Sequence, residues 1–157
     1  MNTVSKIKKL ISGKYVLMSA ESCTGGLISS YLTDVGGSSE FIKSNFVTYS
    51  PEAKNKILGV KFETIKKYNV VSSEVALEMV KGLIKKGADF GISTTGILGP
   101  TGDDKEHPLG MCFIGLGFKN KFKTFKYISP KKTRISRKKD ISSYALQLLL
   151  AFIEENV

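Results

Sequence analysis

Histidine, cysteine and long apolar runs are scarce in this sequence, and each scarcity excludes a class of protein. No run approaches the about 18 consecutive apolar residues that a membrane span needs, and the first residues lack the apolar stretch of a signal peptide. We therefore expect a cytoplasmic protein without a membrane segment. The lone histidine and the two cysteines, Cys23 and Cys112, form no clustered ligand set, so neither a metal centre nor a disulfide framework is expected.

The common phosphate-binding and metal-binding motifs are also missing. The sequence has no Gly-x-x-x-x-Gly-Lys-Ser/Thr loop and no Gly-x-Gly-x-x-Gly string, which argues against an ordinary nucleotide triphosphatase or a dinucleotide enzyme. His107 follows a polar loop that contains Asp103 and Asp104, so a Ser-His-Asp triad is disfavoured, and this acidic pair is only a weak candidate for magnesium. We expect no cofactor and no catalytic metal.

The net charge of +10 comes from one segment. Ten basic residues and no acidic residue lie between Lys119 and Lys139, and the rest of the chain is balanced. This segment is either a solvated edge strand and helix start, where lysine discourages edge pairing, or a phosphate-binding region. Nucleic-acid binding is disfavoured, because Phe122, Phe125 and Tyr127 interleave with lysines without forming a recognised stacking motif, and we expect them on the inward face of a strand.

The hydrophobic pattern predicts alternating strands and helices. With 157 residues and 41% hydrophobic content, the chain is expected to form one domain over residues 1–157. Strands are predicted at 15–20, 44–49, 88–94, 111–118 and 122–128, and helices at 2–12, 27–32, 51–58, 72–87 and 131–155. The expected fold class is α/β, a three-layer α/β/α sandwich with a mixed, mostly parallel sheet.

Three loops follow predicted strands and could hold a ligand: residues 21–26, 49–54 and 95–102. In the first, Ser22 precedes a helix and two glycines, an arrangement that suits a nucleophile, although such a serine is more often only a helix cap. A serine needs a base, and Lys54 is the best placed lysine, although composition alone does not choose it. Cys23 is the rival nucleophile, or else a small buried side chain.

Four motifs together indicate a family. They are Ala20-Glu21-Ser22-Cys23-Thr24-Gly25-Gly26, Phe46-Val47-Thr48-Tyr49-Ser50-Pro51-Glu52-Ala53-Lys54, Val71-Ser72-Ser73-Glu74-Val75-Ala76 and Ser93-Thr94-Thr95-Gly96-Ile97-Leu98-Gly99-Pro100. In order and spacing the chain resembles the CinA C-terminal-domain family, which includes stand-alone nicotinamide-nucleotide amidohydrolases. The resemblance covers nearly the whole chain.

The resemblance implies hydrolysis of the carboxamide of nicotinamide mononucleotide to nicotinic acid mononucleotide and ammonia. It implies Ser22 as nucleophile, with Lys54 and Tyr49 activating it and carrying the proton to ammonia. Backbone N–H groups at Gly25 and Gly26, or near Thr95 and Gly96, could stabilise the oxyanion. The implied substrate-binding residues are Glu21, Thr24, Gly25, Gly26, Thr95, Gly96, Arg134 and Lys138. A homo-oligomer such as a dimer is the implied assembly.

Two departures from the family pattern bear on substrate affinity. Lys138 and Lys139 stand where relatives carry arginine, which keeps the charge but loses the planar fork that suits phosphate. Thr101-Gly102 stands where a pair of glycines is common. The alternative function is a non-catalytic nucleotide-binding regulatory module, because the same domain also occurs fused to other domains in proteins named for competence and DNA damage.

Overall fold

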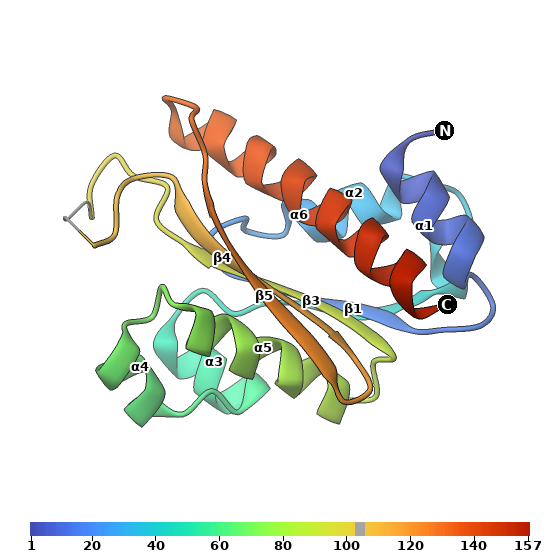
Figure 1. Ribbon diagram of the computed structural model, residues 1–157, viewed down its shortest axis with the longest axis horizontal. Coiled ribbons are helices and arrows are strands. Elements are labelled where there is room, and N and C mark those ends of the chain that lie inside the picture. The colour runs from blue at the N-terminus through green and yellow to red at the C-terminus, as the bar shows by residue number, and fades with distance from the viewer. Residues whose placement is uncertain (103–105) are drawn as a thin grey trace.

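In a computed structural model that describes residues 1–102 and 106–157, a five-stranded sheet separates two helical layers (Figure 1). One face is covered by α1 (Thr3–Ile11), α2 (Leu27–Thr33) and α6 (Arg134–Asn156), and the other by α3 (Pro51–Leu58), α4 (Phe62–Tyr68) and α5 (Ser73–Lys85). A short 3-10 helix, η1 (Ser38–Glu40), precedes the second strand. The predicted three-layer α/β/α sandwich is confirmed.

The sheet contains β1 (Leu17–Glu21), β2 (Ile42–Val47), β3 (Phe90–Gly96), β4 (Met111–Phe118) and β5 (Lys121–Ile128), in the spatial order β2-β1-β3-β4-β5. Strand β1 pairs in parallel with β2 and β3, and β4 pairs antiparallel with β3 and β5. Only β4 therefore runs against the other strands of this sheet, which confirms the expectation of a mixed, mostly parallel sheet.

The connections place a topological switch point between β1 and β3. From β1 the chain passes through α2 on one face to β2, and it returns through α3, α4 and α5 on the other face to β3 (Figure 1). Strand β1 thus leads to β2 on one side, whereas its neighbour β3 leads to β4 on the other side. Ligands in open α/β sheets bind in the crevice beyond the carboxyl ends of such strands.

Apolar side chains fill both sides of the sheet. All five residues of β1 are buried, as expected for a central strand covered on both faces. Leu17 belongs to the core under α1, α2 and α6, whereas Met18 and Ala20 belong to the core under α3 and α5. In the first core the rings of Phe90 and Phe118 stack with centroids 4.3 Å apart.

Helix starts follow local capping chemistry. Ser50 caps α3 by accepting a hydrogen bond from the N–H of Ala53 at 3.1 Å, and Pro51 occupies the first turn, so the helix predicted at 51–58 is confirmed. Helix α6 begins at Arg134 rather than at residue 131, because Thr133 and Ser136 form a capping box. Helix α4 was not predicted, since its residues are at most half-buried and Lys61 supplies no side-chain cap.

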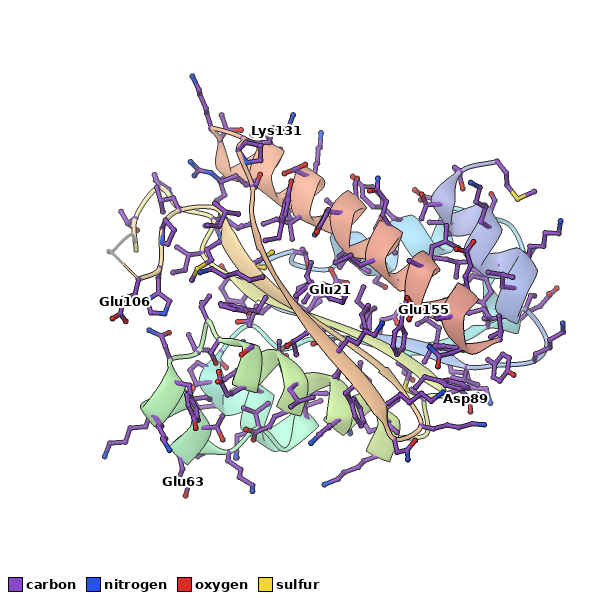
Figure 2. The ribbon with its side chains drawn as sticks, viewed as in Figure 1. Glu21, Glu63, Asp89, Glu106, Lys131 and Glu155 are labelled. Carbon is purple, nitrogen blue, oxygen red and sulfur yellow. The ribbon has the colours of Figure 1, made fainter. Side chains whose placement is uncertain are left out.

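The basic segment forms the edge strand β5 and the start of α6. Phe122, Phe125 and Tyr127 are half-buried, but they do not share the single inward face that was predicted. Phe122 packs against the core under α3 and α5, and Phe125 and Tyr127 pack against the core under α6, because helices cover both faces of the sheet. Lys131 projects near the start of α6 (Figure 2). Across the described ranges, no helix combines the length and apolar content that crossing a membrane requires.

Replacing Gly82 by alanine is expected to destabilise the protein. Gly82 lies where α5 crosses Leu58, and a Cβ there would overlap the Leu58 backbone. Glycine to alanine in a helix ordinarily stabilises by about 0.5–1 kcal/mol, but we expect overpacking to lower the free energy of unfolding by about 1–3 kcal/mol. Urea unfolding measures this, with Gly36→Ala as control, since a Cβ there meets nothing within 4 Å. A more stable Gly82→Ala protein would contradict the contact.

Candidate active site

A cavity of about 290 Å³ opens beyond the carboxyl ends of β1 and β3. Its volume is at the lower end of the range for small-molecule sites, so it has room for one small ligand. The lining comes from the three loops singled out in the sequence, from the segment before α5 and from the start of α6. The lining residues are Ser22, Cys23, Tyr49, Pro51, Lys54, Val70, Val71, Thr95, Gly96, Ile97, Leu98, Gly99, Thr101 and Arg134.

Ser22 and Lys54 meet in this cavity. Ser22 directly follows β1, and Lys54 lies in the first turn of α3. Lys54 Nζ is 2.9 Å from Ser22 Oγ and 2.7 Å from the carbonyl oxygen of Thr48, with the carbonyl of Tyr49 at 3.5 Å. The sequence separates the serine and the lysine by 32 positions, and the fold brings them into direct hydrogen-bond contact.

The Lys54 amine is buried among neutral oxygens. Its side chain is fully buried, and no ion pair of Lys54 occurs among the residues that the structure describes. Burial disfavours the charged form and lowers the pKa of Lys54 from 10.5 to about 8, against a smaller opposing effect of Cys23. About a tenth of the amine is therefore neutral at pH 7 and about half at pH 8, and the neutral form is the one that a lysine base requires.

Cys23 has the opposite character. Burial raises the pKa of its thiol to about 12, and a hydrogen bond with Thr94 only partly offsets this. Its side chain is 7% exposed. Because the thiolate is the reactive form of cysteine, this thiol is a poor nucleophile.

Glu21 and Thr24 lie beside the cavity without lining it. Glu21 is buried in the interior (Figure 2), where its carboxylate accepts hydrogen bonds from the N–H groups of Ile28 and Ser29, both at 2.9 Å. Thr24 Oγ1 donates to Glu21 at 2.6 Å and is 2.9 Å from Thr94 Oγ1. These contacts fix the loop after β1 and the start of α2, so both residues have a structural role that the sequence did not reveal.

The two glycine pairs differ in their access to the cavity. Gly25 and Gly26 do not line it, and the N–H of Gly25 donates to the Ser22 carbonyl at 3.0 Å. Thr95 and Gly96 do line it. The N–H of Ile97 donates to Met111 on β4 at 2.9 Å, so the N–H of Gly96 faces the opposite way, toward β1, because successive groups alternate in an antiparallel ladder.

Arg134 spans the rim of the cavity, whereas Lys138 lies off it. Arg134 donates to the hydroxyl of Tyr49 at 2.8 Å and to the carbonyl of Gly99 at 2.6 Å. Lys138 does not line the cavity, and its Nζ lies 3.1 Å from where a Cβ on Gly25 would be. The structure thus brings Ser22, Lys54, Tyr49 and Arg134 to one cavity, with Tyr49 bonded to the arginine.

Several contributors to the site were not predicted from the sequence. The Thr48 carbonyl holds Lys54, and Arg137 donates to the Leu98 carbonyl at 2.7 Å, which fixes part of the cavity wall. Val70 and Val71 supply apolar wall from the segment before α5. The motif starting at Val71 was a usable signal, because it stood among the four that carry the resemblance, but a backbone carbonyl leaves no residue-type signature.

The sequence also offered candidates for histidine and metal chemistry. His107 does not line the cavity. Within residues 1–102 and 106–157, no three His, Cys, Asp or Glu side chains are grouped so as to hold a metal ion. The pair Asp103 and Asp104 lies outside the described residues.

The buried amine predicts a pH-dependent stability difference between the wild type and Lys54→Met. The folded-state pKa is about 8 and the unfolded value about 10.5, so between these values the unfolded chain binds more protons and wild-type stability rises with pH. The variant should therefore lose about 3 kcal/mol relative to the wild type from pH 7 to 10.5. Urea unfolding across this range measures the change.

Lys56→Met is the matched control, because it removes an exposed amine from the same helix. It measures how much the free energy of unfolding changes with pH when an exposed lysine is lost. A difference between the wild type and Lys54→Met that stays constant over the range would contradict the buried, destabilised ammonium.

Comparison with known proteins identifies relatives of this chain. The curated CinA-like protein of Leptospira biflexa is 42% identical over 152 residues, which is 96% of this chain and 36% of that protein. The CinA-like protein of Fusobacterium nucleatum is 48% identical over 125 residues, 80% of this chain and 30% of that protein. The chain thus spans about a third of the length of the curated relatives it matches.

Solved structures match over a larger share of their length. The competence/damage inducible protein CihA from Agrobacterium tumefaciens has a TM-score of 0.90 and 33% identity, covering 95% of this chain and 92% of that one. The competence damage-inducible protein A from Klebsiella pneumoniae has a TM-score of 0.91 and 27% identity, covering 99% and 97%. The family profile described as CinA C-terminal domain matches residues 2–153. The chain belongs to the CinA C-terminal domain family.

Proposed function

We propose that this chain is a serine amidohydrolase that hydrolyses the carboxamide of nicotinamide mononucleotide to nicotinic acid mononucleotide and ammonia. The observation that carries the proposal is the 2.9 Å contact between Lys54 Nζ and Ser22 Oγ in a cavity. A serine becomes a nucleophile when an adjacent base takes its proton, and a buried lysine with a lowered pKa is such a base. The choice of substrate rests on the family resemblance.

The reaction divides into two balanced halves. Ser22 Oγ attacks the amide carbon while its proton passes to neutral Lys54, and the tetrahedral intermediate then expels ammonia after its nitrogen receives that proton. An acyl ester on Ser22 remains. Lys54, neutral again, takes a proton from water as the water attacks the ester, and then returns it to the serine oxygen as the acid is released.

The backbone supports the developing negative charge. The N–H of Gly96 faces the β1 side of β3, and Gly96 lines the cavity. A Cβ at Gly96 would come within 3.0 Å of Cys23 Sγ and closer still to Cys112, so only glycine fits here. We assign the oxyanion to this side of the cavity, since Gly25 and Gly26 do not line it.

The rim of the cavity suits an anionic substrate. Arg134 is exposed at the start of α6, and a guanidinium binds phosphate through two parallel hydrogen bonds. Val70, Val71 and Ile97 give the wall an apolar part that can accept a planar ring. A mononucleotide carries both features, with the amide to be cleaved on the ring.

Ser22→Ala is expected to abolish ammonia release, whereas Cys23→Ala should retain most of it. Loss of the nucleophile should lower kcat/KM by at least about 10³-fold. Cys23 serves as matched control because it is the adjacent residue, lines the same cavity and has a raised pKa. Ammonia released from nicotinamide mononucleotide is measured for wild type and both variants, with and without EDTA.

Each outcome of that assay is informative. Activity that survives EDTA and is lost only in Ser22→Ala supports serine catalysis, and loss only in Cys23→Ala would overturn the assignment of the nucleophile. A folded wild type that releases no ammonia but binds the nucleotide would instead support the non-catalytic regulatory module. The names of the relatives specify no reaction. This assay therefore decides between the amidohydrolase and the regulatory module.

The kcat/KM of the wild type is expected to rise with pH through an apparent pKa near 8. Neutral Lys54 is the reactive form, so below pH 8 the rate should fall about tenfold per pH unit. The profile is measured from pH 6 to 9.5, beside that of His107→Gln. If the rise of kcat/KM with pH disappears in this variant, that result would point to the histidine as base and against Lys54.

A further inference from the structure

The hydroxyl of Tyr49 is bonded to the rim arginine and not to the serine or the lysine amine. Arg134 donates to it at 2.8 Å across 85 positions of sequence. In this part of the chain, the Lys54 amine contacts the backbone carbonyls of Thr48 and Tyr49 and not the Tyr49 hydroxyl. The phenol therefore lines the cavity in a position set by an arginine that also bounds it.

Little else holds the Tyr49 ring. The residue is 61% exposed. Among the described residues, no aromatic ring contact involves Tyr49. Within the same residues, the only side-chain hydrogen bond of Tyr49 is the one from Arg134. Among the described residues, the Arg134 hydrogen bond is thus the contact that holds the phenol hydroxyl in place.

We propose that the phosphate of the substrate displaces Tyr49 from Arg134 and so releases the phenol for proton transfer beside Ser22 and Lys54. This inference rests on the proposed function and adds to it a substrate-dependent activation. Tyr49 and Arg134 together sense whether the bound amide carries an anion.

Hydrogen-bond strength favours this exchange. A phosphate oxygen accepts a charge-assisted hydrogen bond from guanidinium that is roughly twice as strong as a neutral one. The Tyr49 hydroxyl is a neutral acceptor, and the terminal nitrogen that it occupies takes part in both two-pronged edges of the guanidinium. That nitrogen carries two N–H groups, one on each edge, so an anion that binds the edge from which Tyr49 accepts competes directly with the phenol.

The released phenol completes a balanced proton relay. After the attack by Ser22, Lys54 holds the serine proton, and the departing nitrogen needs one. Tyr49 gives its hydroxyl proton to that nitrogen and takes one from the Lys54 ammonium, so the phenol is regenerated and the amine is neutral again. While Arg134 occupies the hydroxyl oxygen, the phenol is held at the rim and away from this transfer.

The exchange predicts that the phosphate acts on kcat as well as on binding. The phosphate does not react, but in this exchange its binding energy is used to release Tyr49 for the reaction. Removing the phosphate should therefore lower kcat. Nicotinamide riboside offers the same amide without the phosphate. In the wild type we expect its kcat to be at least about tenfold below that of the mononucleotide, and added inorganic phosphate to restore part of it.

Arg134→Gln separates this exchange from simple phosphate binding. The variant frees Tyr49 permanently, so its kcat for the riboside should exceed that of the wild type several-fold, while its kcat/KM for the mononucleotide falls. An arginine that only bound phosphate would leave the riboside kcat unchanged, and that result would overturn the exchange. Tyr49→Phe should show a low kcat with both substrates and no activation by phosphate. Lys139→Gln removes an exposed charge from the same helix and is the matched control.

A binding measurement tests the exchange independently of catalysis. Inorganic phosphate is titrated into protein with carbon-13 labelled tyrosine rings, and the Tyr49 resonance is assigned with Tyr49→Phe. A phosphate-dependent shift of Tyr49 that disappears in Arg134→Gln but persists in Lys139→Gln supports the exchange, even if the mononucleotide is not hydrolysed and the proposed function fails. Hydrolysis together with an unresponsive Tyr49 would refute the exchange and leave the amidohydrolase standing.

Discussion

The structure of the site depends on one constraint: a lysine amine is buried where its hydrogen-bond acceptors are neutral oxygens. Lys54 reaches the Ser22 hydroxyl and the Thr48 carbonyl, and its side chain is fully buried. An ammonium buried without a carboxylate is destabilised, so the amine tends to lose its proton. The end of β1, the end of β2 and the start of α3 must be placed together for this contact to form.

The order of the strands meets this requirement. Because β1 lies between β2 and β3, the segments that follow all three strands come together at one edge of the sheet. Ser22 follows β1, Thr48 follows β2, and Gly96 ends β3. Helix α6 then brings Arg134 to the rim from the far end of the sequence. Each of these residues lies at the end of a strand or the start of a helix. Few flexible backbone torsions therefore separate the site from the packed core.

Local chemistry explains which parts were predictable. Ser50 and Pro51 specify the start of α3 through a cap and a fixed φ, so the position of Lys54 on that helix followed from the sequence. Its proposed role as a base could be inferred only from the motifs, because its burial depends on strands that are distant in sequence. The bond between Tyr49 and Arg134 had no signal at all, since both are exposed and 85 positions apart.

Glu21 is adjacent in sequence to Ser22, the proposed nucleophile, but its contacts are with the start of α2. A carboxylate facing Lys54 would form an ion pair, raise the pKa of the amine and keep it protonated. Instead both carboxylate oxygens of Glu21 accept N–H groups at the start of α2, and Thr24 donates a third hydrogen bond. The negative charge is thereby satisfied where a helix start is partly positive. The hydrogen bonds from the start of α2 to the acid next to Ser22 are thus part of what keeps a carboxylate away from Lys54, as the proposed base role requires.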